Sequence, residues 1–394
     1  MPIANEVVIV GTGVTPFGVL HDHGYLDLIA QASFDALDDA GITLDQVEAA
    51  WLGTAEPLLA GLVGDSGAAI AEALQFRGRP VSRVSNFCTS GMEAVRHAAM
   101  AVAAGEHEVV LAIGAEKMRD VTPRESLVAK TTNQTHPTLS KGRTAPGQFA
   151  LLANRYLATY DQDVEVLAHV SVKNHEHATR NPKAHYRKPV TLEQVLDAPR
   201  IAEPLGVLDC TPTTDGGAAV IVASRRWAEA NASRYAVIRG IGLAGIDGYF
   251  AMHSREHNDF LGFASTRAAA AMAYEQAGIA DPRAEIDVVE CHDCFTITEI
   301  INTEDLGLAR PGEGVQLLLD GVTAWGGDTP VNLSGGLQSC GHPVGATGVR
   351  MIAEIADQVT GRAGERQVAG ASTGVAHTLG GPGAVACVAV LGAP

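Results

Sequence analysis

The hydrophobic positions form short apolar runs that glycine-rich turns and longer amphipathic stretches separate. Glu6–Gly11 (EVVIVG) is a continuous apolar run ended by glycine, which is typical of a strand buried on both faces. An amphipathic helix is predicted from about Leu26 to Ala40, with Gly41 as its C-cap. Val47 to Leu52 is another short strand. This alternation predicts an α/β protein in which helices pack on sheets.

The same order of elements recurs late in the chain, which indicates an internal duplication. Ala36–Gly53 and Ala273–Asp293 both contain a helix end, the tripeptide Ala-Gly-Ile, a polar turn and an apolar strand. Cys88–Arg96 and His342–Arg350 each open a long helix that a strand follows. In a duplicated protein with parallel-type sheets, we expect an active site where the carboxyl ends of strands from both halves meet. The strands expected after these helices are Val109–Gly114 and one that begins at Val368–Gly370.

A polar region of different character separates the two predicted halves. We expect an N-terminal half at residues 1–118 and 203–250, an inserted loop domain at 119–202 and a C-terminal half at 251–394. The apolar strand Ala218–Val222 marks the return to the core after the insert.

The insert contains a basic stretch, Lys173–Thr191, in an otherwise acidic protein. One hypothesis is a solvated excursion packed on the core. The other is a cap that contacts the phosphates of an anionic ligand. The basic side chains that could do so are Lys173, Lys183, Arg187 and Lys188.

Composition and charge narrow the possible functions. The 394 residues are 46% hydrophobic and carry a formal net charge of −17, so a large core is expected and a basic footprint for nucleic acid is absent. The N-terminus lacks the basic and apolar regions of a signal peptide, and no run of about 18 apolar residues occurs. Six cysteines in so long a chain do not suggest a disulfide framework. We expect a cytoplasmic protein.

The first glycine-rich turn, GTGVTPFG at residues 11–18, superficially offers the start of a dinucleotide-binding fingerprint. Such a fingerprint must open directly into a helix. Here Thr15-Pro16 and a polar segment follow instead, which favours a simple turn after a central strand.

Cys88 is the first candidate for chemistry. It lies at the start of a predicted helix, where the positive end of the helix dipole favours a thiolate. The small neighbours Thr89, Ser90 and Gly91 would let a substrate approach the sulfur. The alternative is a buried structural cysteine, which is the usual role of an unpaired thiol.

The second candidate is the tetrapeptide Cys291-His292-Asp293-Cys294, where an apolar strand stops abruptly. A structural zinc takes four ligands, so this pair would need Cys340 and His342 to complete a site. A disulfide between the two cysteines is another possibility. The third is that His292 and Cys294 supply a hydrogen-bond donor and a proton shuttle.

Two glycine-rich loops complete the set of candidates. His342 in SGGLQSCGHPVGATG is well placed to accept a proton from a thiol, and its alternative role is a helix cap or surface group. GVAHTLGGPG, with His377 and Gly380, precedes a final strand and can direct backbone N–H groups at an oxyanion, or it is a tight turn.

Together these motifs resemble the thiolase superfamily, and the resemblance spans essentially the whole chain. It rests on NFCTSGMEAV, ECHDCF, SGGLQSCGHPVGATG and GVAHTLGGPGA in this order. The His-Asp-Cys-Phe sequence resembles the sterol-carrier-protein and archaeal branch. Within that branch the chain departs at two places, because His377-Thr replaces the common His-Asn and Cys340 stands where Lys is frequent.

The resemblance implies a fold of two βαβαβαββ halves in an αβαβα layered arrangement with an inserted loop domain. It implies that Cys88 is the nucleophile, that His342 is its base and that Cys294 moves protons. His292 and His342 would stabilise an enolate oxygen. Backbone N–H groups of Cys88 and of the loop after His377 would hold the oxyanion at the acyl carbon.

The resemblance also implies substrates and partners. The substrates would be coenzyme A thioesters and coenzyme A itself, with no metal and no separate cofactor. Lys183, Arg187 and Lys188 would contact the coenzyme A phosphates. A homodimer or tetramer is expected.

Two alternative functions stay open within this resemblance. The first is a thiolase-like subunit that works with a small partner carrying an OB-fold and a zinc ribbon. The second is a retro-aldolase, although the similar enzymes of that kind lack the nucleophilic cysteine.

Overall fold

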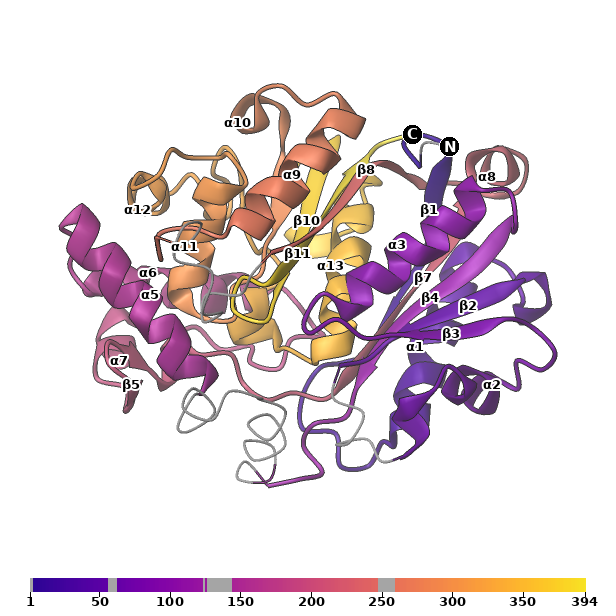
Figure 1. The fold of residues 1–394 in the computed structure, drawn as a ribbon, viewed down its shortest axis with the longest axis horizontal. Helices are drawn as coiled ribbons and strands as arrows, with labels where there is room; N and C mark the ends of the chain where they lie inside the picture. The colour runs from indigo at the N-terminus through magenta and orange to yellow at the C-terminus, as the bar shows by residue number, and fades with distance from the viewer. Residues whose placement is uncertain (1–2, 56–61, 123–124, 126–143, 247–258) are drawn as a thin grey trace.

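The computed structural model describes residues 3–55, 62–122, 125, 144–246 and 259–394 (Figure 1). The N-terminal part has the order expected from the apolar pattern. Its elements are β1 (Val7–Val14), α1 (Tyr25–Ala40), β2 (Ala49–Gly53), α2 (Ala68–Leu74), β3 (Val81–Val84), α3 (Ser90–Ala103), β4 (Val109–Glu116), β7 (Gly216–Ser224) and α8 (Arg225–Asn231).

The C-terminal part repeats this order with extra helices. Its elements are β8 (Ala236–Gly245), α9 (Ala264–Ala277), α10 (Pro282–Glu285), β9 (Val288–Glu290), α11 (Thr296–Asp305), α12 (Gly314–Leu319), the π-helical turn η6 (Gly336–Cys340), α13 (Val344–Val359), β10 (Thr373–Gly380) and β11 (Val385–Gly392). Between β4 and β7 lie α5 (Ala145–Tyr160), α6 (Glu165–Ala178), α7 (Leu192–Leu196), β5 (Arg200–Ala202) and β6 (Leu205–Gly206).

Strand pairing confirms the predicted duplication. The larger sheet of the described chain has the order β3-β2-β4-β7-β1-β8-β11-β10-β9. The two halves meet where β1 pairs antiparallel with β8. In the C-terminal half, Val331 pairs with Val289 of β9, as β3 pairs with β2 in the N-terminal half. The expectation of parallel-type sheets is only partly right. β2, β3 and β4 are parallel, whereas β7, β1, β8 and β11 are antiparallel neighbours.

Alternating side chains of the strands place helices on both faces of each half. On β1, Val7 and Ile9 belong to the core that α3 and α13 share, while Val8 and Val10 pack toward α1. The helices α3 and α13 contact one another and strands of both halves, and α9 packs on β8 and β11 (Figure 1). The layers are therefore helix, one half of the sheet, paired central helices, the other half of the sheet and helix, and the two halves of the sheet join where β1 meets β8.

Glycines allow the two central helices to approach closely near their N-terminal ends. A Cβ atom added at Gly91 would lie 2.2 Å from the carbonyl oxygen of Gly345, and one at Gly348 would lie 2.4 Å from the backbone nitrogen of Met92. Any side chain at these positions would push α3 and α13 apart. This contact brings together the residues that precede the two helices.

Two details of the predicted organisation differ or fall outside the structure. The strand expected from Val368 begins only at Thr373, because the chain turns at Gly370, whose φ is 76°. The expected boundary between residues 250 and 251 lies outside the described residues. Among the described residues, no helix is both long and apolar enough to cross a membrane.

Candidate active site

Cys88 lies in the turn between β3 and α3 and is partly exposed. The hydroxyls of Thr89 and Ser90 donate to the carbonyl oxygens of Asn86 and Phe87, at 2.6 and 2.5 Å. Phe87 has a φ of 49°, in the left-handed region that side chains seldom occupy. This tight turn presents the sulfur of Cys88 just before the N-terminus of α3.

His342 occupies the matching place before α13, and its tautomer follows from its neighbours. The hydroxyl of Thr347 donates to the carbonyl oxygen of Pro343, at 3.0 Å. Its oxygen therefore accepts from His342 Nδ1, which lies 2.7 Å away. In a neutral imidazole this places the proton on Nδ1 and leaves the lone pair of Nε2 as the base.

The structure brings three of the predicted residues to one point. Ligand atoms of Cys88, His292 and His342 all lie within 4.8 Å of one another. The two imidazole rings meet edge to face, with centroids 5.0 Å apart and planes at 85°. The candidate nucleophile, the candidate base and a second imidazole thus converge from two helix starts and one strand end.

His292 is held at its backbone from both sides. Its N–H donates to Nδ1 of His377, at 3.4 Å, and its carbonyl oxygen accepts from Asn302 Nδ2, at 2.8 Å. Because His377 Nδ1 accepts, Nε2 carries the proton and donates to Thr266 Oγ1, at 3.0 Å. His377 therefore supports His292 from inside the sheet, and its side chain is fully buried.

Burial sets the protonation of these groups. Desolvation lowers the pKa of His292 to about 3, and the same cause holds the pKa of His377 well below its usual value. Burial raises the pKa of the Cys294 thiol well above its usual value, with the nearby Cys88 as the second cause. His292 is therefore a neutral hydrogen-bonding group, and Cys294 is a protonated thiol.

Gly380, at the end of β10, lies against the turn that carries Cys88. A Cβ atom at Gly380 would lie 2.8 Å from Cβ of Phe87 and 3.2 Å from the backbone nitrogen of Cys88. A side chain there would crowd the N–H group of Cys88. The absence of a side chain keeps this N–H and the end of β10 close together, as an oxyanion pocket requires.

The two rival interpretations of the Cys291–Cys294 segment find no support in the geometry. Neither cysteine forms a disulfide. Cys291 is fully buried, and Asn332 Nδ2 lies 3.6 Å from its sulfur. Within the described ranges, the side chains close enough to share an ion are those of Cys88, His292 and His342, and Cys291, Cys294 and Cys340 do not join them.

The basic segment of the insert divides into buried and exposed cations. Lys173 is buried, where its Nζ lies 2.8 Å from Glu299, so the hypothesis that it faces phosphate is wrong. Lys183 Nζ donates to the carbonyl oxygen of Val14. Arg187 and Lys188 are exposed.

The exposed cations lie near the candidate site. The backbone N–H groups of His185 and Tyr186 donate to carbonyl oxygens of Cys340 and Ser339, at 3.1 and 2.9 Å. This pairing anchors the basic segment beside the π-helical turn that leads to His342. Arg187 and Lys188 follow directly, so they stay candidates for phosphate contacts.

Sequence reasoning missed the residues that orient the site. Thr347, Asn302 and Thr266 fix His342, His292 and His377, respectively. Thr347 lies in the same motif as His342, so its hydroxyl was a visible signal. Thr266 and Asn302 lie on the separate helices α9 and α11, and no local pattern connects them to the histidines.

Buried histidines predict a measurable acid sensitivity. Burial lowers the pKa of His177 to about 3, far below its value in an unfolded chain, so folding disfavours its protonation. The stability that results is complete above pH 6.5 and is lost as the pH falls toward 3, by about 1.4 kcal/mol per pH unit for one histidine. In chemical unfolding between pH 6.5 and 5, His177→Gln should reduce the pH slope by about this amount. The control Thr179→Val, at the residue that caps the same helix, changes no titrating group and should keep the wild-type slope. Equal slopes in all three proteins would contradict the assignment.

Comparisons with protein families and curated relatives agree with this geometry. The family model "Thiolase, N-terminal domain" matches residues 7–226, and "Thiolase C-terminal domain-like" matches residues 249–393. An acetyl-CoA acetyltransferase of Methanothermobacter thermautotrophicus is 38% identical over 97% of this chain and 98% of its own length. Human sterol carrier protein 2 is 33% identical over 96% of this chain and 71% of its own.

Solved structures share the fold of this chain. The structure titled "Ltp2-ChsH2(DUF35) aldolase" matches with a TM-score of 0.85 and 28% identity, over 100% of this chain and 99% of that chain. The Acat5 thiolase of Ascaris suum in complex with coenzyme A matches in fold, with a TM-score of 0.72 and 17% identity over 99% and 100% of the two chains. The two matched domain families and the relatives in archaea and animals establish that this chain belongs to the thiolase superfamily, in the branch that includes sterol carrier protein 2.

Proposed function

We propose that this protein is an acyl-CoA C-acyltransferase, a thiolase that makes or cleaves 3-ketoacyl-CoA through an acyl group on Cys88. The observation that carries the proposal is the convergence of Cys88, His292 and His342 within 4.8 Å. The similarity to acetyl-CoA acetyltransferases over nearly the whole chain supports the same reaction class.

Acylation begins at the base. His342 Nε2 accepts the proton of the Cys88 thiol, and Nδ1 keeps its own proton, which it donates in a hydrogen bond to Thr347 Oγ1. The thiolate attacks the 3-keto carbon of the substrate, and the bond between carbons 2 and 3 then breaks. The oxyanion of this step would accept hydrogen bonds from the backbone of Cys88 and of the Gly380 region. Each such donor is typically worth about 3–4 kcal/mol of transition-state stabilisation.

The leaving group is the enolate of acetyl-CoA, which needs a proton at carbon. The Cys294 thiol supplies it, and its raised pKa ensures that it holds a proton in the resting site. The imidazoles of His292 and His342 meet the enolate oxygen. Cys294 then takes the proton of the incoming coenzyme A thiol, which attacks the acyl group on Cys88 and regenerates the enzyme.

The rest of coenzyme A requires an anion-binding surface. Arg187, Lys188 and Lys183 are the candidates for its phosphates, because their segment is anchored beside the turn before His342. No separate cofactor enters this reaction, since each step uses side chains of the chain and the thioester itself. We further propose that the protein is cytoplasmic and acts as a homodimer or tetramer.

The test is mass measurement of the intact protein after incubation with acetyl-CoA or acetoacetyl-CoA. We expect an acetyl adduct of one equivalent that peptide mapping places on Cys88. Cys88→Ala should show no adduct, whereas Cys210→Ala, at another partly buried cysteine, should keep it. Absence of an adduct from a range of acyl-CoAs would refute the proposal.

A second function keeps one observation in its favour. The likeness to the "Ltp2-ChsH2(DUF35) aldolase" favours a carbon–carbon lyase, or a subunit that requires a small partner of that kind. Such a lyase would turn over substrate without any adduct on Cys88. Activity that persists in Cys88→Ala, or that depends on a co-purified small protein, would select this alternative.

A further inference from the structure

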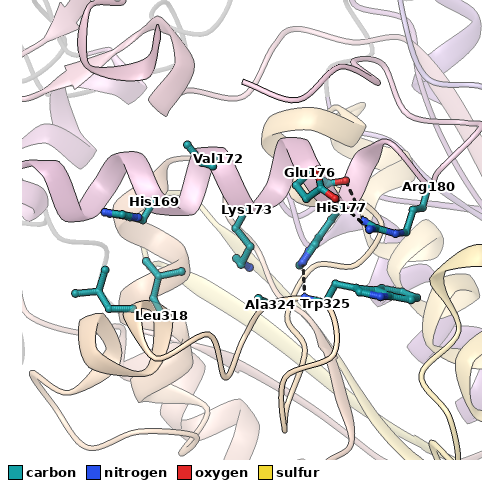
Figure 2. Close-up of a pocket in the computed structure, with 10 residues that line it drawn as sticks. His169, Val172, Lys173, Glu176, His177, Arg180, Leu318, Ala324 and Trp325 are labelled. Carbon is teal, nitrogen blue, oxygen red and sulfur yellow. Dashed lines mark hydrogen bonds and ion pairs between the residues drawn. The ribbon is translucent and has the colours of Figure 1, made fainter. Parts of the chain in front are cut away.

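Helix α6 of the insert holds the segment at Val331 and Asn332 through buried polar side chains on one of its faces. Lys173 Nζ donates to the carbonyl oxygen of Val331, at 2.9 Å. His177 Nδ1 donates to the carbonyl oxygen of Asn332, at 3.1 Å, and its Nε2 accepts from Trp325 N–H, at 3.0 Å. Figure 2 shows Lys173 and His177 leaving α6 on the same side, at a cavity of about 440 Å³. These contacts fix the segment from behind the active site.

Asn332 connects this segment to the end of strand β9, which Cys291 and His292 follow. Its side-chain oxygen accepts from the backbone N–H of Cys291, at 2.9 Å, and its Nδ2 donates to Glu299, at 2.7 Å. Glu299 is itself paired with Lys173. The residue immediately before His292 is therefore tied to α6 and α11 through one asparagine.

Asp293 lies at the centre of these contacts, between His292 and Cys294 in the sequence. One carboxylate oxygen accepts from Leu337 N–H, at 2.7 Å, in the turn that leads to His342. The other accepts from Asn174 Nδ2, at 2.9 Å, and Asn174 also donates to Glu299, at 2.8 Å. Asp293, Asn174 and Glu299 are all almost completely buried. Every oxygen of Asp293 is therefore committed to a structural donor, and none is left for substrate.

The close fit around Asp293 makes its position exact. A Cβ atom at Gly336 would lie 2.1 Å from Oδ2 of Asp293, so the turn can approach only because this residue is glycine. Two N–H donors facing a buried carboxylate hold the peptide that carries it in one orientation. The orientation of this peptide in turn determines where the side chains of His292 and Cys294 lie.

We propose that Asp293 is a positioning residue that fixes His292 and Cys294 against the turn before His342, with Asn174 of the insert as its partner. This inference rests on the proposed function, because it assigns Asp293 to the proton-transfer step at the carbon of acetyl-CoA. Asp293 does not touch the reacting atoms. It determines whether the His292 and Cys294 side chains meet the enolate with the correct geometry, for which errors of about 1 Å cost up to 10²-fold in rate.

The test separates two steps of the reaction in the variant Asp293→Asn. The new side chain keeps an oxygen for Leu337 but turns an NH₂ group toward Asn174, so two donors face one another. We expect exchange of the methyl protons of acetyl-CoA in D₂O, followed by NMR, to fall by about 30- to 100-fold. Acetylation of Cys88, measured by rapid quenching and intact mass, should fall by less than about threefold.

Glu304→Gln is the matched control, because it makes the same carboxylate-to-amide change on α11. Glu304 bonds to Tyr156 and to the N–H of Gly314, away from the catalytic residues. Both rates should stay within about threefold of wild type in this control. Asn174→Ala removes the partner of Asp293 from α6 and should give the same unequal loss, so the test holds even if Asp293→Asn does not fold.

Two outcomes decide between the ideas. An equal fall of both rates in Asp293→Asn and Asn174→Ala would overturn the positioning role, since a general loss of folded protein lowers both steps together. A wild-type protein that neither acetylates Cys88 nor exchanges the methyl protons would instead refute the proposed function.

Discussion

Replacing Cys294 by alanine should lower turnover of acetoacetyl-CoA by about 10³-fold while Cys88 still becomes acylated. The reason is that Cys294 supplies and removes the proton at carbon, whereas His342 activates the nucleophile. The thiol is buried, and burial keeps it protonated in the resting site. A variant without it can still form the acyl-enzyme from acetyl-CoA, because coenzyme A can depart as a thiolate without an acid, but the variant lacks an acid for the enolate carbon.

The measurement pairs steady-state thiolysis with the mass of the protein after exposure to acetyl-CoA. Cys387→Ala is the control, because Cys387 is a fully buried cysteine in β11 and takes no part in the proposed reaction. This control should keep turnover within a few-fold of wild type. Full activity in Cys294→Ala would show that another group moves the proton.

The second large effect concerns the base. His342→Ala should slow acylation of Cys88 by about 10³-fold at pH 7, because no other group in the proposed mechanism accepts the thiol proton. Thr347→Val keeps the imidazole of His342 but removes the hydroxyl oxygen that accepts from Nδ1 at a distance of 2.7 Å. The loss of this one hydrogen bond should cost about tenfold, or about 1.4 kcal/mol.

Alkylation of Cys88 by iodoacetamide as a function of pH reports the base directly. In His342→Ala the reaction should require a higher pH than in wild type, because the thiolate loses its imidazole partner. Thr360→Val is the matched control at the residue that follows α13, since its hydroxyl donates to carbonyl oxygens at the far end of that helix from His342. Equal alkylation profiles in His342→Ala and wild type would exclude His342 as the base.

The sequence motifs singled out Cys88 and His342, which the structure brings together, because each motif depends on its immediate neighbours. Cys88 and His342 were recognised from the glycine-rich turns that precede two similar helices, and the repeated order of elements predicted the duplicated fold. The strand that stops at Cys291 was also visible as an apolar run. Its burial explains why Cys291 is inert in the structure, with no disulfide and no place in a shared ligand group.

The assignment of cations in the insert shows where local reasoning failed. Lys173 resembles a surface lysine in the sequence, yet it is buried against Glu299, which lies 126 positions away in the chain. A buried lysine needs such a partner, and the partner cannot be read from its neighbours.

The sequence by itself determined the fold class and the internal repeat, because these follow from periodicity and turns, and its short motifs singled out Cys88 and His342 as the candidate thiol and imidazole. Only the tertiary structure decided the tautomer of His342, the support of His292 by His377 and the hydrogen-bond partners of Asp293. The partner of Asp293 on α6 is 119 residues distant, and its hydrogen bond exists only when the insert packs against the C-terminal half. Hydrogen bonds between such distant groups depend on how buried faces meet, and no local pattern encodes that meeting.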